Sequence, residues 1–232
     1  MKKTLFIAAS MLLLVTLFAP GAKAQEWSTG LDIYSSYIWR GAKFGSGPAF
    51  QPSLELNAGG FAIGAWGSVS SSVDEGFEMD LYVGYSFDLG EGNSLSLTVT
   101  DYYFGGDWTS SDYHSIEPMV GVGLGGLSLT GAYMFLPDGA MSADGSENDG
   151  DVYVEASYSF EKFSIGVGAG EGQYTLHADD EGNEKDDFGI CNINIGTSKE
   201  VKITDTFTLP VSGAVILNPT TGGFFITVGI SL

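Results

Sequence analysis

Acidic side chains recur at alternate positions of several otherwise apolar segments, and a single arginine accompanies them. Glu78 and Asp80 stand two residues apart in one such segment, Glu117 and Glu155 lie in two others, and Arg40 is the only arginine of the chain. If these segments are β-strands, alternation puts the charged groups on the face opposite the apolar residues. One arginine facing several carboxylates can set the electric field of an aqueous path, or it can bind the carboxylates and stiffen the wall.

Catalytic and metal-binding patterns are weak in this chain. The two histidines, His114 and His177, lie in or beside loop-like segments, and no serine motif accompanies them. The segments 143–151 and 178–187 are dense in Asp, Glu, Gly and Asn, but neither has the spacing of a calcium-binding loop. We predict no catalytic residue, no metal site and no cofactor. Weak divalent-cation binding by these acidic loops and a lipid-acting enzyme remain as alternatives.

The elements that must position the charged residues are predicted to be strands. From Trp27 onward, runs of about ten residues alternate apolar with small or polar side chains, which is the period of a β-strand. Twelve runs follow this pattern: 27–40, 49–57, 61–70, 77–89, 94–103, 115–124, 127–135, 152–160, 163–172, 188–198, 207–218 and 223–232. A soluble sandwich and a membrane barrel both show such alternation, so the period alone does not distinguish them.

The lengths of the connections favour the barrel. Links after odd-numbered runs are mostly long, as at 136–151 and 173–187, whereas those after even-numbered runs are mostly short, as at 58–60 and 125–126. Long external loops and short periplasmic turns are typical of an outer-membrane barrel whose termini are both periplasmic. We therefore predict an all-β, antiparallel, up-and-down transmembrane β-barrel of twelve strands.

Aromatic residues at both ends of the apolar faces support this prediction, because amphipathic rings settle at the headgroup level of a bilayer. The residues expected at the outer rim are Tyr37, Trp39, Phe77, Tyr103, Tyr133, Phe135 and Phe224. Those expected at the inner rim are Trp27, Phe61, Tyr85, Phe87, Tyr158, Phe160 and Phe163.

The N-terminus has the pattern of a secretory signal peptide. Two lysines precede an apolar stretch that ends at Ala22-Lys23-Ala24, so cleavage is expected after residue 24 and the barrel occupies 25–232. Removing the three lysines of this segment takes the formal charge from −20 to −23. Such a charge disfavours binding to nucleic acid. The apolar-x-apolar end, Ile230 to Leu232, resembles the signal read by the barrel-assembly machinery.

With the apolar face toward lipid, the remaining face lines the lumen. The charged residues predicted there are Arg40, Glu55, Glu78, Asp80, Glu117 and Glu155. The aromatic residues predicted there are Trp66, Tyr82, Tyr102 and Tyr153. The charges form either a constriction or a set of structural pairs, and the rings form either a pocket for a small, partly apolar solute or the filling of a narrow barrel.

A resemblance to a known family rests on motifs in the first half of the chain. The motifs are Ser35-Ser36-Tyr37-Ile38-Trp39-Arg40-Gly41, Gly47-Pro48-Ala49-Phe50-Gln51, Ala65-Trp66-Gly67-Ser68 and Glu78-Met79-Asp80-Leu81-Tyr82-Val83-Gly84-Tyr85. They resemble those of the TorF-type porins, a conserved family of outer-membrane barrels. The sequence departs from that pattern at Pro52, where the family tends to have glycine. The resemblance implies an outer-membrane barrel with a pore.

The sequence thus predicts a monomeric, non-enzymatic porin-like barrel of the bacterial outer membrane. It would passively pass or bind small solutes through a lumen that favours cations, and it would contact outer-membrane lipid and lipopolysaccharide. The alternative is a structural or adhesin-type barrel with acidic surface loops and no open pore.

Overall fold

The structure is a computed structural model that describes residues 25–70 and 77–232. The signal peptide predicted for 1–24 and the link predicted at 71–76 lie outside the described residues. Among the described residues, no helix is long and apolar enough to cross a membrane.

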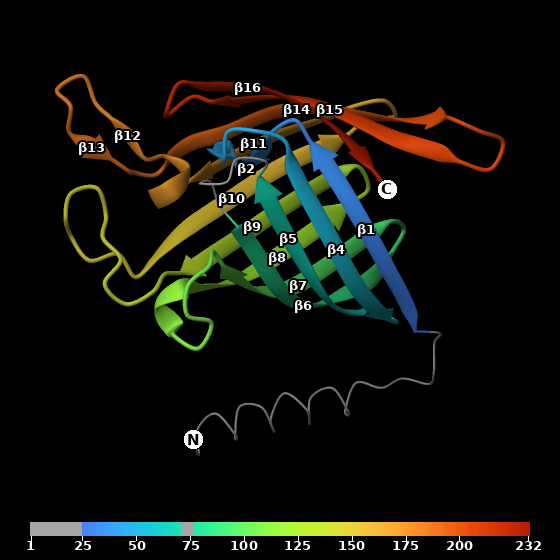
Figure 1. Cartoon of the computed structure of the whole chain (residues 1–232), viewed down its shortest axis with the longest axis horizontal. Coiled ribbons are helices and arrows are strands. Elements are labelled where there is room, and N and C mark those ends of the chain that lie inside the picture. The colour runs from blue at the N-terminus through green and yellow to red at the C-terminus, as the bar shows by residue number, and fades with distance from the viewer. Residues whose placement is uncertain (1–24, 71–76) are drawn as a thin grey trace, which may run out of the picture.

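Twelve antiparallel strands close into a barrel (Figure 1). They are β1 (Glu26–Tyr34), β4 (Ala49–Ala58), β5 (Phe61–Ser70), β6 (Phe77–Gly90), β7 (Asn93–Tyr103), β8 (His114–Leu124), β9 (Leu127–Phe135), β10 (Gly150–Ser159), β11 (Ser164–Gly170), β14 (Gly189–Lys202), β15 (Thr208–Asn218) and β16 (Gly223–Ser231). Successive strands are neighbours, and β1 closes the ring by pairing with both β4 and β16. The predicted fold class and strand number are confirmed.

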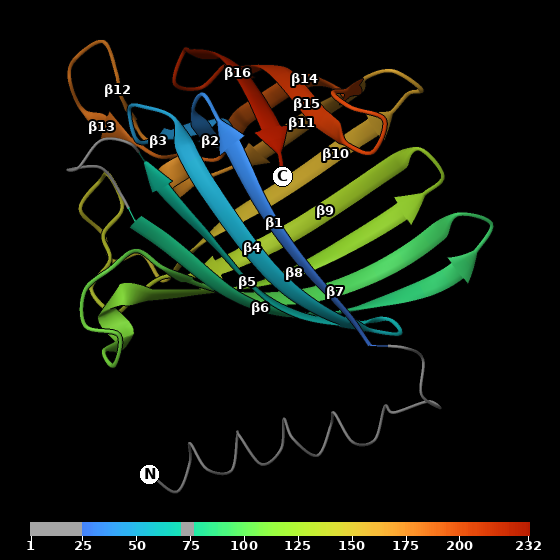
Figure 2. The ribbon, with the colours of Figure 1, turned by 45° about the vertical axis from the view of Figure 1, so that its right-hand side comes forward.

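The two ends of the barrel differ in their connections (Figure 2). The long segments gather at one end, which we call the loop end; they carry the hairpins β2 (Tyr37–Trp39) to β3 (Ala42–Phe44) and β12 (His177–Ala178) to β13 (Glu184–Lys185), and the 3₁₀ turns η1 (Ser111–Tyr113) and η2 (Gly172–Tyr174). The opposite end, which we call the turn end, has tight turns such as those between β4 and β5 and between β8 and β9.

Each strand turns an apolar face outward and a polar or small face inward. In β8, Ile116, Pro118 and Val120 are exposed, whereas Ser115 and Glu117, which alternate with them, are buried. Alternation along a strand produces this division, and closure removes the edges that would leave backbone groups unpaired. The buried residues therefore line an interior rather than form a packed core between two layers.

The expected rims of aromatic residues are partly present. At the turn end, Tyr158 packs against Phe160 and Phe160 against Phe163, each with ring centroids 4.7 Å apart, and all three side chains are exposed. At the loop end, Phe135 and Phe224 are exposed as predicted.

The first predicted strand is wrong in its second half. Strand β1 ends at Tyr34, and the chain then turns back as the hairpin β2–β3 instead of continuing to Arg40. Arg40 and Gly41 form its two-residue turn with φ of 50° and 81°, the left-handed backbone of a type I′ turn. The hairpin folds into the barrel, so Tyr37 and Trp39 contact interior rings. The prediction that they lie at the lipid-facing outer rim is therefore wrong.

Candidate functional site

The hairpin β2–β3 crosses the interior at the loop end and is attached at its base and its tip. At the base, the Ser35 amide donates to the Val228 carbonyl at 2.8 Å. At the tip, Asn218 Nδ2 donates to the Gly41 carbonyl at 3.3 Å. A Cβ at Gly41 would overlap the carbonyl oxygen of Cys191, so glycine is required both for the positive φ and for this close approach.

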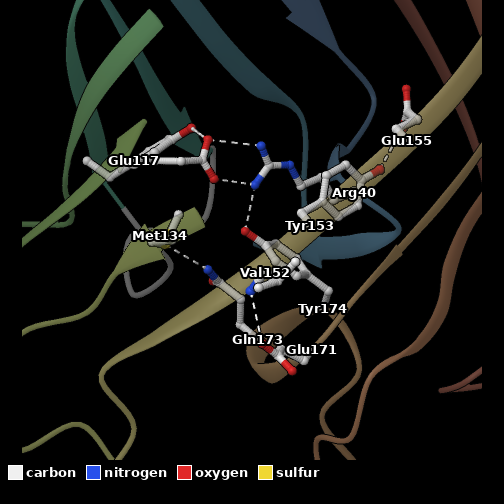
Figure 3. A network of polar contacts seen from close by, with 10 residues as sticks. Arg40, Glu117, Met134, Val152, Tyr153, Glu155, Glu171, Gln173 and Tyr174 are labelled. Carbon is white, nitrogen blue, oxygen red and sulfur yellow. Dashed lines mark hydrogen bonds and ion pairs between the residues drawn. The ribbon is translucent and has the colours of Figure 1, made fainter. Parts of the chain in front are cut away.

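Arg40 projects from the tip of the hairpin to the opposite wall (Figure 3). Its Nη1 lies 2.5 Å from Glu117 Oε2 and its Nη2 lies 2.9 Å from Glu117 Oε1, which is a bidentate ion pair. Nη1 also donates to the Tyr174 hydroxyl at 2.7 Å. The guanidinium carbon lies 4.5 Å from the ring centroid of Trp39 and 4.3 Å from that of Tyr153, so the cation contacts two aromatic rings.

Burial makes each charge of this pair depend on the other, because a single buried charge would have neither water nor a partner. Only 1% of Glu117 is exposed, and its Oε1 also accepts a hydrogen bond from the Tyr102 hydroxyl at 3.1 Å. Burial opposes the charge of Arg40, but the hydrogen bonds that Arg40 donates to Glu117 and the nearby negative charge outweigh it, so the pKa of Arg40 is raised. Burial also raises the pKa of Tyr174, so its hydroxyl keeps its proton.

A second group of charges lies on β6 beside this pair. Asp80 stands between two aromatic residues of the flanking strands, Trp66 of β5 and Tyr102 of β7. The hairpin covers them: the ring of Tyr37 lies 5.5 Å from that of Trp66, and the ring of Trp39 lies 5.4 Å from that of Tyr102. The structure thus gathers Arg40, Glu117, Tyr102 and Tyr153 into one cluster, with Glu78, Asp80 and Trp66 next to it.

The other predicted lumen residues make separate pairs. Glu155 accepts from the Tyr153 hydroxyl at 2.5 Å and from Asn192 Nδ2 at 2.9 Å, which connects it indirectly to the Arg40 cluster. Glu55 accepts from the Tyr82 hydroxyl at 2.8 Å and from Asn57 Nδ2 at 2.6 Å. Their roles stay predictions.

Sequence reasoning missed Tyr174, Tyr37 and Trp39 as members of the site. Tyr174 lies in the 3₁₀ turn η2 of a loop, where strand alternation assigns no face. The hairpin could have been found, because two short alternating stretches flank Arg40-Gly41 and glycine favours the φ > 0 of a two-residue turn.

The described residues also line two cavities. One, of about 430 Å³, lies between the loops at the loop end and is lined by Asp144, Asp151, Glu171, Glu184, Lys185 and Asp186, among others. Hydrogen bonds from Ser146 hold the pKa of Asp144 below its usual range, so that carboxylate stays charged. The other, of about 410 Å³, is lined by Tyr34 and by small residues of β14 and β15 such as Gly196, Ser212 and Ala214.

His114, the first residue of β8, has both ring nitrogens within hydrogen-bond distance of oxygen atoms. His114 Nδ1 lies 2.9 Å from Asp101 Oδ1, and Nε2 lies 3.1 Å from the Trp108 carbonyl oxygen. Neither nitrogen is free to activate a serine hydroxyl in this arrangement. Among the described residues, no group of three or more His, Cys, Asp or Glu side chains could hold a metal ion.

A closed barrel of this kind, with a polar interior, has the fold of the porins. A NanC porin structure aligns over 88% of this chain and 98% of its own, at 9% identity and a TM-score of 0.51, which shows the fold alone. An outer-membrane channel from Pseudomonas putida F1 aligns over 92% and 95% of the two chains, at 14% identity and a TM-score of 0.45. OprD of Pseudomonas aeruginosa aligns over 90% of this chain and 66% of its own, at 13% identity and a TM-score of 0.41.

The chain belongs to the family described as bacterial protein of unknown function (Gcw_chp), whose model matches residues 19–208. No curated protein sequence matches it. The narrower resemblance to the TorF-type porins stays a prediction.

Proposed function

We propose that this protein is a porin-like channel of the bacterial outer membrane that passively passes or binds small solutes, with a preference for cations. Both termini would lie on the periplasmic side and the loop end would face outward. The observation that carries the proposal is the hairpin β2–β3, which narrows the interior of a closed barrel and is held there by the Arg40–Glu117 pair.

The location is supported by the outer surface of the barrel. Large apolar side chains are exposed along the strands, among them Val120, Leu129, Val154, Val215 and Ile226. An apolar band of this kind is costly in water and is favourable in a bilayer. Exposed aromatic rings at both ends are in keeping with insertion to a defined depth.

The preference for cations is supported by the charges along the interior and at the loop end. Glu117 is neutralised by Arg40, but Glu78, Asp80 and Glu155 have no basic partner among the ion pairs of the described residues. The cavity between the loops has a single lysine among its acidic lining residues. Negative potential along a path raises the local concentration of cations.

The docked hairpin also favours a second candidate, a structural or adhesin-type barrel without an open pore. Its tip is held by hydrogen bonds from Arg40 to Glu117 and Tyr174 and from Asn218 to the Gly41 carbonyl. In this case the acidic loops would contact a partner and the interior would have only a structural role.

Single-channel recording in planar bilayers separates the two candidates. The channel proposal predicts step-like currents, with a reversal potential in a salt gradient that indicates cation selectivity. The variant Arg40→Ala removes the guanidinium at the tip of the hairpin and should raise both conductance and cation selectivity. Absence of step-like current from the purified barrel would rule out the channel and leave the structural barrel.

A further inference from the structure

The side chains of Glu78 and Asp80 are buried in the interior without a positive partner. Asp80 is 7% exposed and Glu78 is 5% exposed. Neither takes part in the ion pairs of the described residues, and the one nearby guanidinium, that of Arg40, is committed to Glu117. Asp80 Oδ1 is buried and has no hydrogen-bond partner in the described structure. A buried acceptor without a hydrogen-bond partner is costly, so a donor from a bound ligand would be favourable at this atom.

Asp80 stands between aromatic residues of the two neighbouring strands. Trp66 and Tyr102 flank Asp80 on the adjacent strands, and the hairpin places Tyr37 against the first ring and Trp39 against the second. Ring faces attract cations, and a carboxylate among them adds a full opposite charge. The same combination already holds a cation elsewhere in this interior, because the guanidinium of Arg40 contacts the rings of Trp39 and Tyr153 while it pairs with Glu117.

We propose that Glu78 and Asp80, enclosed by Tyr37, Trp66 and Tyr102, form a binding site for a primary alkylammonium group. A primary ammonium carries three N–H donors, and it can satisfy Asp80 Oδ1 while it contacts the Glu78 carboxylate. The two carboxylates are two residues apart on one face of β6, so their Cα atoms are separated by only about 7 Å. The alkyl chain would lie against the rings. A divalent metal ion would instead need six or more oxygen ligands, which rings do not supply.

A bound ammonium group would take the place of a weak contact of the hairpin. The Tyr37 hydroxyl donates to Glu78 Oε1 at 3.3 Å, which is long for an O–H···O bond. An ammonium group can replace this donor and form shorter, charge-assisted bonds to the same carboxylate. The site deepens the proposed function, since it names a class of solute, but binding can be measured whether or not the barrel conducts.

Isothermal titration calorimetry of the detergent-purified barrel with propylammonium chloride tests the site, and quenching of tryptophan fluorescence provides a second readout. We expect propylammonium to bind at least about tenfold more tightly than 1-propanol, tetramethylammonium or sodium, because only propylammonium combines charge with N–H donors. Equal affinity for sodium or for tetramethylammonium would overturn the assignment of a primary ammonium.

Variants locate the binding to this site. Asp80→Asn removes one charge with little change in shape and should weaken propylammonium binding about tenfold or more. Asp88→Asn is the matched control on the same strand, because Asp88 accepts a hydrogen bond from the Gly90 amide near the turn end, and it should bind as the wild type does. If Asp80→Asn does not fold, Glu78→Gln takes its place with the same expected loss.

Wild-type affinity in the folded Asp80→Asn or Glu78→Gln variant would overturn the site. Failure of the binding site can be distinguished from failure of the channel proposal. Binding without step-like current would contradict the channel and leave the site, whereas current without binding would contradict the site alone.

Discussion

At the scale of single residues, Arg40 connects the hairpin to three other segments of the barrel interior. It links the hairpin to β8 through Glu117, to the loop turn η2 through Tyr174, and to β10 by stacking on Tyr153. Its φ of 50° is a left-handed conformation that costs a residue with a Cβ about 1–2 kcal/mol. From this turn position the only arginine of the sequence forms its ion pair with Glu117 and its ring contacts.

Arg40→Ala should lower the free energy of unfolding by about 3–5 kcal/mol, because it leaves Glu117 charged and buried without its partner. Alanine bears the same cost of positive φ, so the difference reports the lost contacts. Denaturant unfolding in detergent micelles, followed by tryptophan fluorescence, measures the change.

Lys202→Ala is the control for this measurement. Lys202 pairs with Asp205 at 2.6 Å, but the two side chains are 66% and 95% exposed, so water screens them and removal should change stability very little. Equal losses for Arg40→Ala and Lys202→Ala would show that the Arg40–Glu117 pair does not secure the hairpin.

At the scale of elements, the hairpin β2–β3 depends on its docking. Each of its strands has three residues, and a two-stranded hairpin of that length is not stable alone in water. Its contacts with β8, β14 and β15 must therefore hold it in the interior. Gly41 is the point of closest approach, because a Cβ there would meet the backbone of β14.

Gly41→Ala should displace the tip of the hairpin and lower the unfolding midpoint more than Gly222→Ala does. Both glycines have positive φ, of 81° and 73°, but an added Cβ at Gly222 meets nothing within 4 Å. The difference between the two variants in denaturant unfolding therefore isolates the packing of the tip against Cys191. If the two midpoints fall equally, the tip is not closely docked.

This element also marks the limit of what the sequence predicts. Alternation predicts the barrel strands and assigns Glu117, Tyr102 and Tyr153 to a face opposite the apolar residues, because a strand has a fixed period of two. The same period extended the first strand through Arg40, because Tyr37 and Trp39 keep the spacing of two up to the turn. Only the three-dimensional structure shows that this alternation belongs to a hairpin that folds inward.

The pairings inside the barrel could not be predicted for a related reason. Glu117 lies 77 residues from Arg40 along the chain and Tyr174 lies 134 residues from it. Their contact depends on closure of the ring and on the path of two loops. Periodicity determines which face a side chain occupies but not which distant side chain it meets.

At the scale of the whole molecule, the barrel and the hairpin have separable roles. The wall is continuous without the hairpin, because β1 pairs with β4 along its full length and Tyr34 lies directly opposite Ala49. A two-residue turn such as Asn-Gly can therefore join these strands in place of residues 35–48. The wall would remain closed while the interior lost the rings and the arginine of the hairpin.

The most direct test of a channel narrowed by this hairpin compares the single-channel conductance of the wild type with that of the barrel in which Asn-Gly replaces 35–48. Heat-modifiable migration in gels would first establish that both barrels are folded. The hairpin account predicts a severalfold larger conductance for the shortened barrel, because the interior element is gone and the wall is intact. Equal conductance, or no step-like current from either barrel, would contradict it.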